Sequence, residues 1–381
     1  MPAFAYRHIK DLYPVFWSKS REMVLALTNS IEREKPGPIQ DIKQAPVVEI
    51  GGWTSRAALD IIGVAGMGQD FNAIQDPDTE LSVTYRKIFQ PTRQAQVLAL
   101  LSLFLPLWLL RAIPVQRNND IAIGANTIKK ICRQLISQKK EKLDNKEKRV
   151  DVDVLSVAIE SGGFTDENLV DQLMTFLVAG HETTATSMVW AIYALCQNPS
   201  YQTRLRNEIH ANLPSIDDGS TPVTDKVLER LPFLHAVCQE VLRVHSPVPL
   251  TLREAATDTS ILDQHVPKGT RIILAPWAVN LSTSLWGPDA ADFNPDRWMG
   301  PGRANTGGAE SNYAFLTFLH GPRSCIGQAF AKAEFACLLA SLVGSFEFEL
   351  ADPEMVIGIK GGVTARPKDG MPVRMRMVEG W

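Results

Sequence analysis

The chain has 381 residues, of which 45% are apolar and 21% are charged, so it is long enough to fold around a substantial core. Its formal net charge of -3 argues against a nucleic-acid partner, because such proteins carry a basic excess that neutralises phosphates. The cysteines are odd in number, widely spaced and without a CxxC pair, which indicates a reducing compartment rather than a disulfide framework or a structural zinc site. They are Cys132, Cys196, Cys238, Cys325 and Cys337.

Two segments bear on membrane association. Residues 1–17 carry Arg7, His8 and Lys10 before any apolar run, so they do not form a secretory signal or a membrane anchor. The most apolar stretch, 97–110, contains Pro106 and is shorter than the ~20 residues that a spanning helix needs. It is expected either to lie at a membrane interface or to be a core helix, and the pattern alone leaves both open.

The spacing of apolar residues and of helix breakers predicts mostly helices over residues 1–250. After Pro247 the texture changes to short β-rich runs, such as 270–274 and 372–377, separated by Gly, Pro and Asp. We therefore predict a mainly α fold with small β-sheets, organised as a single domain over residues 1–381.

One predicted helix is unusually long. Thr165 can cap its N-terminus, and helical character continues to about Cys196, which corresponds to roughly 45 Å. Its centre reads Ala179-Gly180-His181-Glu182-Thr183-Thr184. Gly and Thr weaken a helix, and a Thr hydroxyl can bond a backbone carbonyl, so we expect a local distortion there.

The strongest chemical signal is a loop that contains one cysteine, with the sequence Phe318-Leu-His-Gly321-Pro-Arg323-Ser-Cys325-Ile-Gly327. Glycines on both sides let a flat cofactor approach the sulfur, and a helix that starts directly afterwards would favour the thiolate. A buried free cysteine is the commoner fate of a lone Cys. Five matched positions would arise by chance on the order of once in ten thousand chains of this length, however.

This loop resembles the cysteine-ligand loop of the haem-thiolate monooxygenases, the cytochromes P450. The resemblance implies the cytochrome P450 fold and a haem b cofactor (iron protoporphyrin IX) with Cys325 as the axial iron ligand. It also implies that Arg323 binds a haem propionate and that Phe318, Gly321 and Gly327 shape the haem site.

The resemblance continues upstream of this loop. Glu240 and Arg243 are spaced to lie on one helix face, and with Arg297 they resemble the family's structural ion network, which locks the cysteine loop. Arg253 lies at the spacing of a second propionate-binding arginine, although an exposed strand arginine is the alternative.

The centre of the long helix resembles the family's oxygen-activating segment. The resemblance assigns Glu182 as a proton-relay acid and Thr183 as the hydroxyl that steadies bound O2, while Ala179 and Gly180 leave room above the haem. His181-Glu182 also resembles the start of the zinc-peptidase pattern HExxH. Ala185 stands where the second histidine is needed, so that interpretation is rejected.

The family resemblance further implies insertion of one oxygen atom from O2 into a small apolar organic substrate. Electrons would come from NADPH through NADPH-cytochrome P450 reductase. The resemblance also implies a location at the cytoplasmic face of the endoplasmic reticulum, with peripheral membrane contact through residues 97–110. Expected substrate-facing positions, each of which could equally be core, are Phe176, Leu250, Thr251, Val363 and Thr364.

Two alternatives stay open. A haem-thiolate isomerase, dehydratase or peroxygenase would need no proton relay, and Glu182-Thr183 argues against it. A non-catalytic remnant that binds no haem is the second, because the family's anchor, first strands and one substrate loop have no counterpart here. We therefore expect an N-terminally truncated form of the fold that retains haem poorly.

Overall fold

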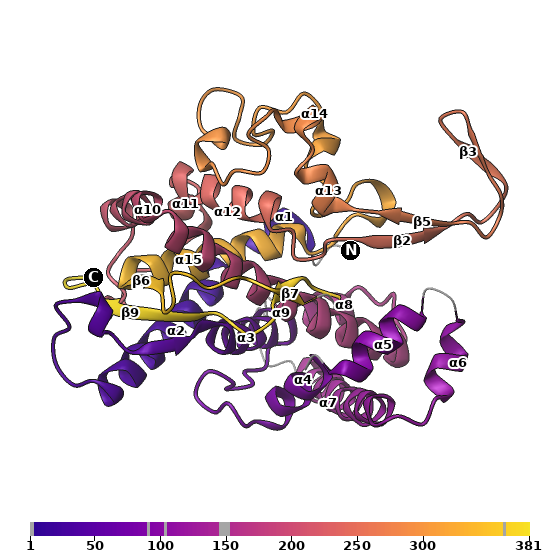
Figure 1. The fold of residues 1–381 in the computed structure, drawn as a ribbon. Coiled ribbons are helices and arrows are strands. Elements are labelled where there is room, and N and C mark those ends of the chain that lie inside the picture. Colours follow the sequence, from indigo (N-terminus) through magenta and orange to yellow (C-terminus); the bar gives the residue numbers. More distant parts are fainter. Residues whose placement is uncertain (1–3, 90–91, 103–104, 145–152, 361–362) are drawn as a thin grey trace.

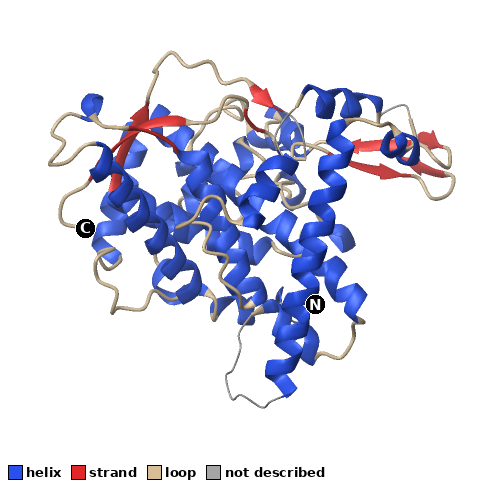
Figure 2. Ribbon diagram, turned by 90° about the horizontal axis from the view of Figure 1, so that it is seen from below, coloured by secondary structure: helices blue, strands red, loops and turns tan. Residues whose placement is uncertain are grey.

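Two buried helices, α9 (Asp166–Gln197) and α15 (Gln328–Ser345), cross the middle of the molecule and contact each other (Figure 1). The computed structural model describes residues 4–89, 92–102, 105–144, 153–360 and 363–381. Both central helices are apolar on nearly all sides over their C-terminal halves, as expected for helices that other helices surround. The predicted mainly α architecture is confirmed (Figure 2).

The remaining helices pack around this pair, with α3 lying along α9 and α2 along α15. Their bounds are α1 (Tyr6–Lys10), α2 (Tyr13–Glu34), α3 (Ile50–Ile61), α4 (Glu80–Phe89), α5 (Arg93–Leu101), α6 (Leu107–Ala112), α7 (Gln116–Asp144), α8 (Val154–Glu160), α10 (Pro199–Asn212), α11 (Asp225–Leu228), α12 (Pro232–Val244), α13 (Pro276–Asn280) and α14 (Thr283–Trp286). A π-helical turn, η3 (Ile62–Gly66), continues α3, and 3-10 turns lie at η2 (Ile42–Gln44), η4 (Pro295–Trp298), η5 (Asn312–Ala314) and η6 (Gly321–Arg323).

The strands form small antiparallel sheets. The largest has the order β1-β9-β6, built from β1 (Val47–Glu49), β6 (Phe346–Leu350) and β9 (Pro372–Met377). The two-stranded sheets pair β2 (Thr251–Glu254) with β5 (Arg271–Leu274), β3 (Thr259–Ile261) with β4 (Gln264–Val266), and β7 (Ile359–Lys360) with β8 (Arg366–Pro367). Strands β2 to β5 form an arm that extends away from the helices (Figure 1).

The sequence predicted both ends of α9 to within one residue. The Thr165 hydroxyl accepts from the Asn168 N–H at 3.3 Å, and the helix ends at Gln197, one residue beyond the expected Cys196. The helix is continuous through its centre, the place where the sequence predicts a local distortion. The Thr183 hydroxyl does bond the Ala179 carbonyl oxygen, at 2.8 Å, without interrupting the helix.

Residues 97–110 do not form a core helix. The segment is divided between α5 and α6, with Pro106 at the start of α6, and residues 103–104 lie outside the described part. Val97, Leu100 and Trp108 are each more than half exposed. Among the described segments, no helix combines the length and apolar character that crossing a bilayer requires.

Candidate active site

An apolar cavity of about 200 Å³ lies between α9, the loop that precedes α15, and α15 itself. Helix α9 contributes three hydroxyl side chains to its wall, and the loop contributes the thiol of Cys325. The lining residues are Thr183, Thr184, Ser187, Leu242, Pro247, Val248, Thr251, Pro276, Thr317, Phe318, Leu319, Arg323, Cys325, Ala331 and Phe335. The cavity therefore brings together two motifs that are far apart in the sequence.

The cysteine loop has a tightly defined backbone. The Cys325 N–H donates to the Phe318 carbonyl oxygen at 2.8 Å, and Gly321 adopts φ +76°, a conformation that favours glycine. A side chain added at Gly321 would meet no atom within 4 Å, so the space beside it is open. Gly327 ends the loop directly before α15, and a Cβ added there would lie 4.0 Å from Cys325 Sγ, so the glycine leaves space beside the sulfur. These features fit the approach of a flat, apolar group such as haem.

Two opposing effects act on the pKa of the Cys325 thiol. Burial raises the pKa of its thiol, and the opposing hydrogen bond from the Gly327 N–H is the smaller effect. A coordinated metal ion deprotonates a thiol outright, so the thiolate form would accompany binding of the haem iron.

Two arginines were expected at this site. Arg323 lines the cavity, is exposed and has no hydrogen bond or ion pair with any described residue, so its guanidinium is available to an anion. Arg253 lies on β2 beside the cavity, and its Nη1 donates to Thr251 Oγ1 at 3.1 Å and to the Leu252 carbonyl at 2.8 Å. Only Thr251 of this local group lines the cavity.

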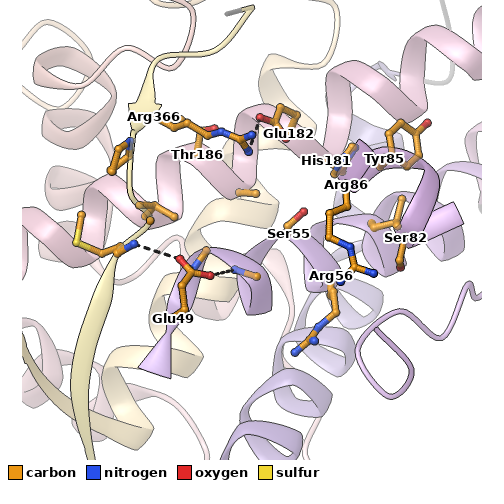
Figure 3. A pocket seen from close by; sticks show the side chains of 18 of the residues that line it. Glu49, Ser55, Arg56, Ser82, Tyr85, Arg86, His181, Glu182, Thr186 and Arg366 are labelled. Carbon is orange, nitrogen blue, oxygen red and sulfur yellow. Dashed lines mark hydrogen bonds and ion pairs between the residues drawn. The ribbon is translucent and has the colours of Figure 1, made fainter. Parts of the chain in front are cut away.

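The acid and the hydroxyl of α9 face different cavities. Thr183 lines the cavity with Cys325. Glu182 lines a second cavity, of about 370 Å³ (Figure 3). Glu182 is 5% exposed, and its Oε1 accepts from Thr364 Oγ1 at 3.0 Å and lies 3.2 Å from Arg366 Nη1. The partners of Glu182 therefore come from the segment around β8, and Glu182 does not line the Cys325 cavity.

Ala179 and Gly180, which the family resemblance places above the haem, are not among the residues that line the Cys325 cavity. A Cβ at Gly180 would lie 3.0 Å from side-chain carbons of Ile62. The small residue is therefore needed where α9 packs against η3. Ala179 contributes its carbonyl oxygen as the acceptor for Thr183.

A second acid, Glu334 on α15, was missed by sequence reasoning. It is fully buried, and its Oε2 accepts from Thr184 Oγ1 at 2.8 Å, which ties α15 to the centre of α9. Its Oε1 has no hydrogen-bond partner among the described residues, and burial raises its pKa well above the usual range. The available signal was an acid, Glu334, followed directly by the apolar run 335–340 of the same helix.

The predicted ion network is present and buried. Arg243 Nε and Nη2 lie 2.8 and 2.7 Å from the two carboxylate oxygens of Glu240, and both side chains are fully buried. Arg297 Nε lies farther away, at 3.6 Å, and its Nη2 pairs with Asp289 at 2.7 Å. Trp298 Nε1 completes the shell by donating to Glu240 at 2.8 Å.

Asn280 connects this network to the cysteine loop. Its carbonyl oxygen accepts from Arg243 at 2.9 Å, while its amide side chain donates to Thr317 and accepts from the Leu316 N–H. Thr317 in turn donates to the Leu242 carbonyl at 2.7 Å. The network thus reaches the residue directly before Phe318, through a buried amide that no motif had indicated.

The expected substrate-facing residues lie in different surroundings. Thr251 lines the Cys325 cavity, whereas Thr364 is buried against Glu182. Leu250 and Val363 are exposed, and Phe176 packs edge-on against Phe4. None of these last three lines the Cys325 cavity among the residues that the structure describes.

Comparison with known proteins agrees with this geometry. The sequence model of the family described as "Cytochrome P450" matches residues 1–371. The chain is 50% identical over 384 residues to cytochrome P450 monooxygenase sphH of Aspergillus fumigatus, covering 100% of this chain and 69% of that protein. It is 45% identical over 421 residues to cytochrome P450 monooxygenase FUM15 of Gibberella moniliformis, covering 99% and 70%.

The fold also matches a solved structure. A crystal structure of a cytochrome P450, CYP102L1, superposes with a TM-score of 0.78 at 23% identity, covering 99% of this chain and 77% of that one. Together with the family match and the cysteine loop beside α9, these findings show that the chain belongs to the cytochrome P450 family, which are haem-containing oxidoreductases.

Proposed function

We propose that this protein is a haem-thiolate monooxygenase that inserts one atom of O2 into an apolar organic substrate. Electrons would come from NADPH through a flavoprotein, NADPH-cytochrome P450 reductase. The observation that carries the proposal is that Cys325, from the loop, and Thr183, from α9, line the same apolar cavity. A thiol and a hydroxyl beside one apolar space suit the iron ligand and the oxygen-side hydroxyl of such an enzyme.

Haem b would be held by Cys325 as iron ligand, by Arg323 and Arg253 as cations for the propionates, and by Phe318 as an apolar wall. Gly327 would keep the space beside the sulfur clear, and the open space at Gly321 would admit the edge of the haem. When bound, the haem supplies the reductive activation of O2. The protein contributes orientation, exclusion of water and delivery of protons.

Thr183 and Glu182 would divide the handling of protons between them. The Thr183 hydroxyl already donates to the Ala179 carbonyl, so its oxygen lone pairs remain available as an acceptor within the cavity. Glu182 faces the second cavity, so a proton from it must reach Thr183 through water or after Glu182 leaves Arg366. The relay therefore requires a movement or a bridging water at this point of α9.

The membrane and partner assignments form part of the same proposal. Exposed Val97, Leu100 and Trp108 on α5 and α6 support peripheral contact with the cytoplasmic face of the endoplasmic reticulum. The chain would bind vesicles of phosphatidylcholine in a flotation assay, and replacing these three residues by Ser would release it. Unchanged flotation of the triple variant would refute the contact.

The central test is the carbon-monoxide difference spectrum of the reduced, haem-loaded protein, which reports thiolate ligation. Cys325→Ala should abolish the thiolate-type band, whereas Cys196→Ala, a half-buried cysteine at the far end of α9, should retain it. A band that survives in Cys325→Ala would refute the ligand assignment. Absence of haem from the unmodified chain would favour the non-catalytic remnant.

A second test separates monooxygenation from redox-neutral chemistry. With reductase and NADPH, consumption of O2 together with labelled oxygen from O2 in the product is expected. Product formation without O2 would instead favour an isomerase or dehydratase, and product formation from peroxide alone would favour a peroxygenase.

A further inference from the structure

The second cavity, which we call the α3–α9 cavity, carries more positive than negative charge. It lies between the start of α3, α4, the centre of α9 and the segment 366–371, and it measures about 370 Å³ (Figure 3). Four cationic side chains line it: Arg56, Arg86, Arg366 and Lys368. Within the described part of the chain, two acids, Glu49 and Glu182, contribute to its wall.

Both acids are already engaged. Glu49 caps α3, where its two oxygens accept from the Gly51 and Gly52 N–H groups at 3.1 and 2.7 Å, and from the Met371 N–H at 3.1 Å. Glu182 contacts Thr364 and Arg366, as described above. Neither acid forms an ion pair with the arginine of α3 or with that of α4 among the described residues. Glu49 and the buried Asp60 attract Arg56 only at longer range, so neither arginine is held in an ion pair by these wall acids.

Arg56 lacks a hydrogen-bond partner. Its Nε is buried and unbonded within the described part of the chain, and its guanidinium carbon lies 4.1 Å from the centre of the Trp53 ring. Burial is the first cause that lowers its pKa, and repulsion from Arg86 is the second. A buried donor without an acceptor costs free energy, which an added acceptor would recover.

Arg86 extends from α4 toward Arg56 (Figure 3). Its partner, Asp78, lies 2.8 Å away, but this pair is at the surface, with side chains 58% and 76% exposed. Exposed pairs of this kind contribute little and are easily exchanged. Ser55 and Ser82 add hydroxyl groups to the same wall. Two guanidinium groups with flanking hydroxyls form a donor set that suits the oxygens of a carboxylate or phosphate.

We propose that the α3–α9 cavity binds a small, free anion that carries carboxylate or phosphate oxygens, held between Arg56 and Arg86. A multivalent anion fits better than a monovalent one, because two guanidinium groups are available and Arg366 lies in the same wall. The cavity volume accommodates a small metabolite rather than a macromolecule.

One consequence rests on the proposed monooxygenase function. Arg366 lines this cavity and also contacts Glu182, so a bound anion competes with Glu182 for the same cation. Occupancy would weaken the hold on the relay acid. The fraction of NADPH electrons that end in product would then change with the concentration of the anion.

Binding is tested on the haem-loaded chain by equilibrium dialysis with radiolabelled inorganic phosphate, and with citrate as competitor, at constant ionic strength. One saturable site per chain is expected. Arg86→Gln and Arg56→Gln should each weaken binding at least about tenfold, which corresponds to about 1.4 kcal/mol. Arg133→Gln, which removes an exposed arginine of α7, should bind as the unmodified chain does.

Arg56→Lys guards against loss of folding, since it keeps the charge and should retain weakened but saturable binding. The site would be overturned if the unmodified chain showed no saturable binding, or if Arg56→Gln and Arg86→Gln bound phosphate as tightly as the unmodified chain does. These measurements do not depend on turnover, so they can fail while the monooxygenase proposal stands. If phosphate binds but leaves the coupling of NADPH to product unchanged, the link to Glu182 is refuted and the site remains supported.

Discussion

Replacement of Glu240 by Gln offers a direct measure of how strongly the ion network holds the fold. Glu240 is fully buried and accepts from Arg243 at two points, from the Asn294 N–H at 2.9 Å and from Trp298 Nε1 at 2.8 Å. Gln keeps the shape and one acceptor oxygen. Its amide group, however, turns a donor toward a donor and leaves the Arg243 cation without its counter-charge.

The expected loss follows from the burial of this pair. Removing one partner of a buried ion pair typically costs about 3–5 kcal/mol, because the remaining charge stays desolvated. A folded chain has only about 5–15 kcal/mol of unfolding free energy in total, so Glu240→Gln should lose a large fraction of it. Arg243 also donates hydrogen bonds to the carbonyl oxygens of Asn280 and Asp292. These bonds keep the arginine in place, so it stays buried in the variant.

Urea unfolding followed by tryptophan fluorescence measures this difference, provided that unfolding is reversible and the slopes of the two transitions agree. The control is Arg133→Gln, whose partner Glu167 lies at 3.1 Å with both side chains more than half exposed. An exposed pair contributes about 0–1 kcal/mol. A Glu240→Gln variant that loses no more than this control would show that the network does not stabilise the fold as argued.

Three further variants test the centre of α9 and its neighbours. Thr183→Ala should leave haem content unchanged but divert electrons to peroxide. The control is Thr175→Ala, an exposed position of the same helix whose hydroxyl also bonds a carbonyl, and it should keep NADPH consumption coupled to product. Equal coupling in the two variants would remove Thr183 from the relay. Because burial raises its pKa, Glu334 keeps a proton in the folded chain that the unfolded chain releases, so stability falls as pH rises from the unfolded toward the folded pKa. Glu334→Gln should abolish that slope in urea titrations at several pH values, and an unchanged slope would contradict the assignment. Gly180→Ala should lower the free energy of unfolding by about 1–3 kcal/mol, because the added methyl overpacks against Ile62. The double variant with Ile62→Val should recover this stability. A loss without recovery would show that the strain lies elsewhere.

Local patterns in the sequence predicted the position of α9, the cysteine loop and the pairing of Glu240 with Arg243. The Thr165 cap and the apolar run behind it located α9, and the glycines around Cys325 identified the loop, because both depend on residues close together in the chain. The three-residue spacing of Glu240 and Arg243 also predicted their pairing, since such residues share one face of a helix.

Only the tertiary structure decided which way α9 presents its central residues. Successive residues of a helix point about 100° apart, so Glu182 and Thr183, adjacent in the motif, must face different surroundings. Which surroundings these are depends on the packing of α3, α15 and the segment around β8 against α9. No local pattern contains that information.

The same reason explains the other differences. Gly180 meets Ile62 because η3 crosses α9 there, and Glu334 finds Thr184 across 150 residues of sequence. Asn280 bridges the ion network to the cysteine loop through contacts that its neighbours in sequence do not reveal. Chemistry carried by one motif could be predicted from the sequence, whereas the surroundings of each side chain arose where distant segments met.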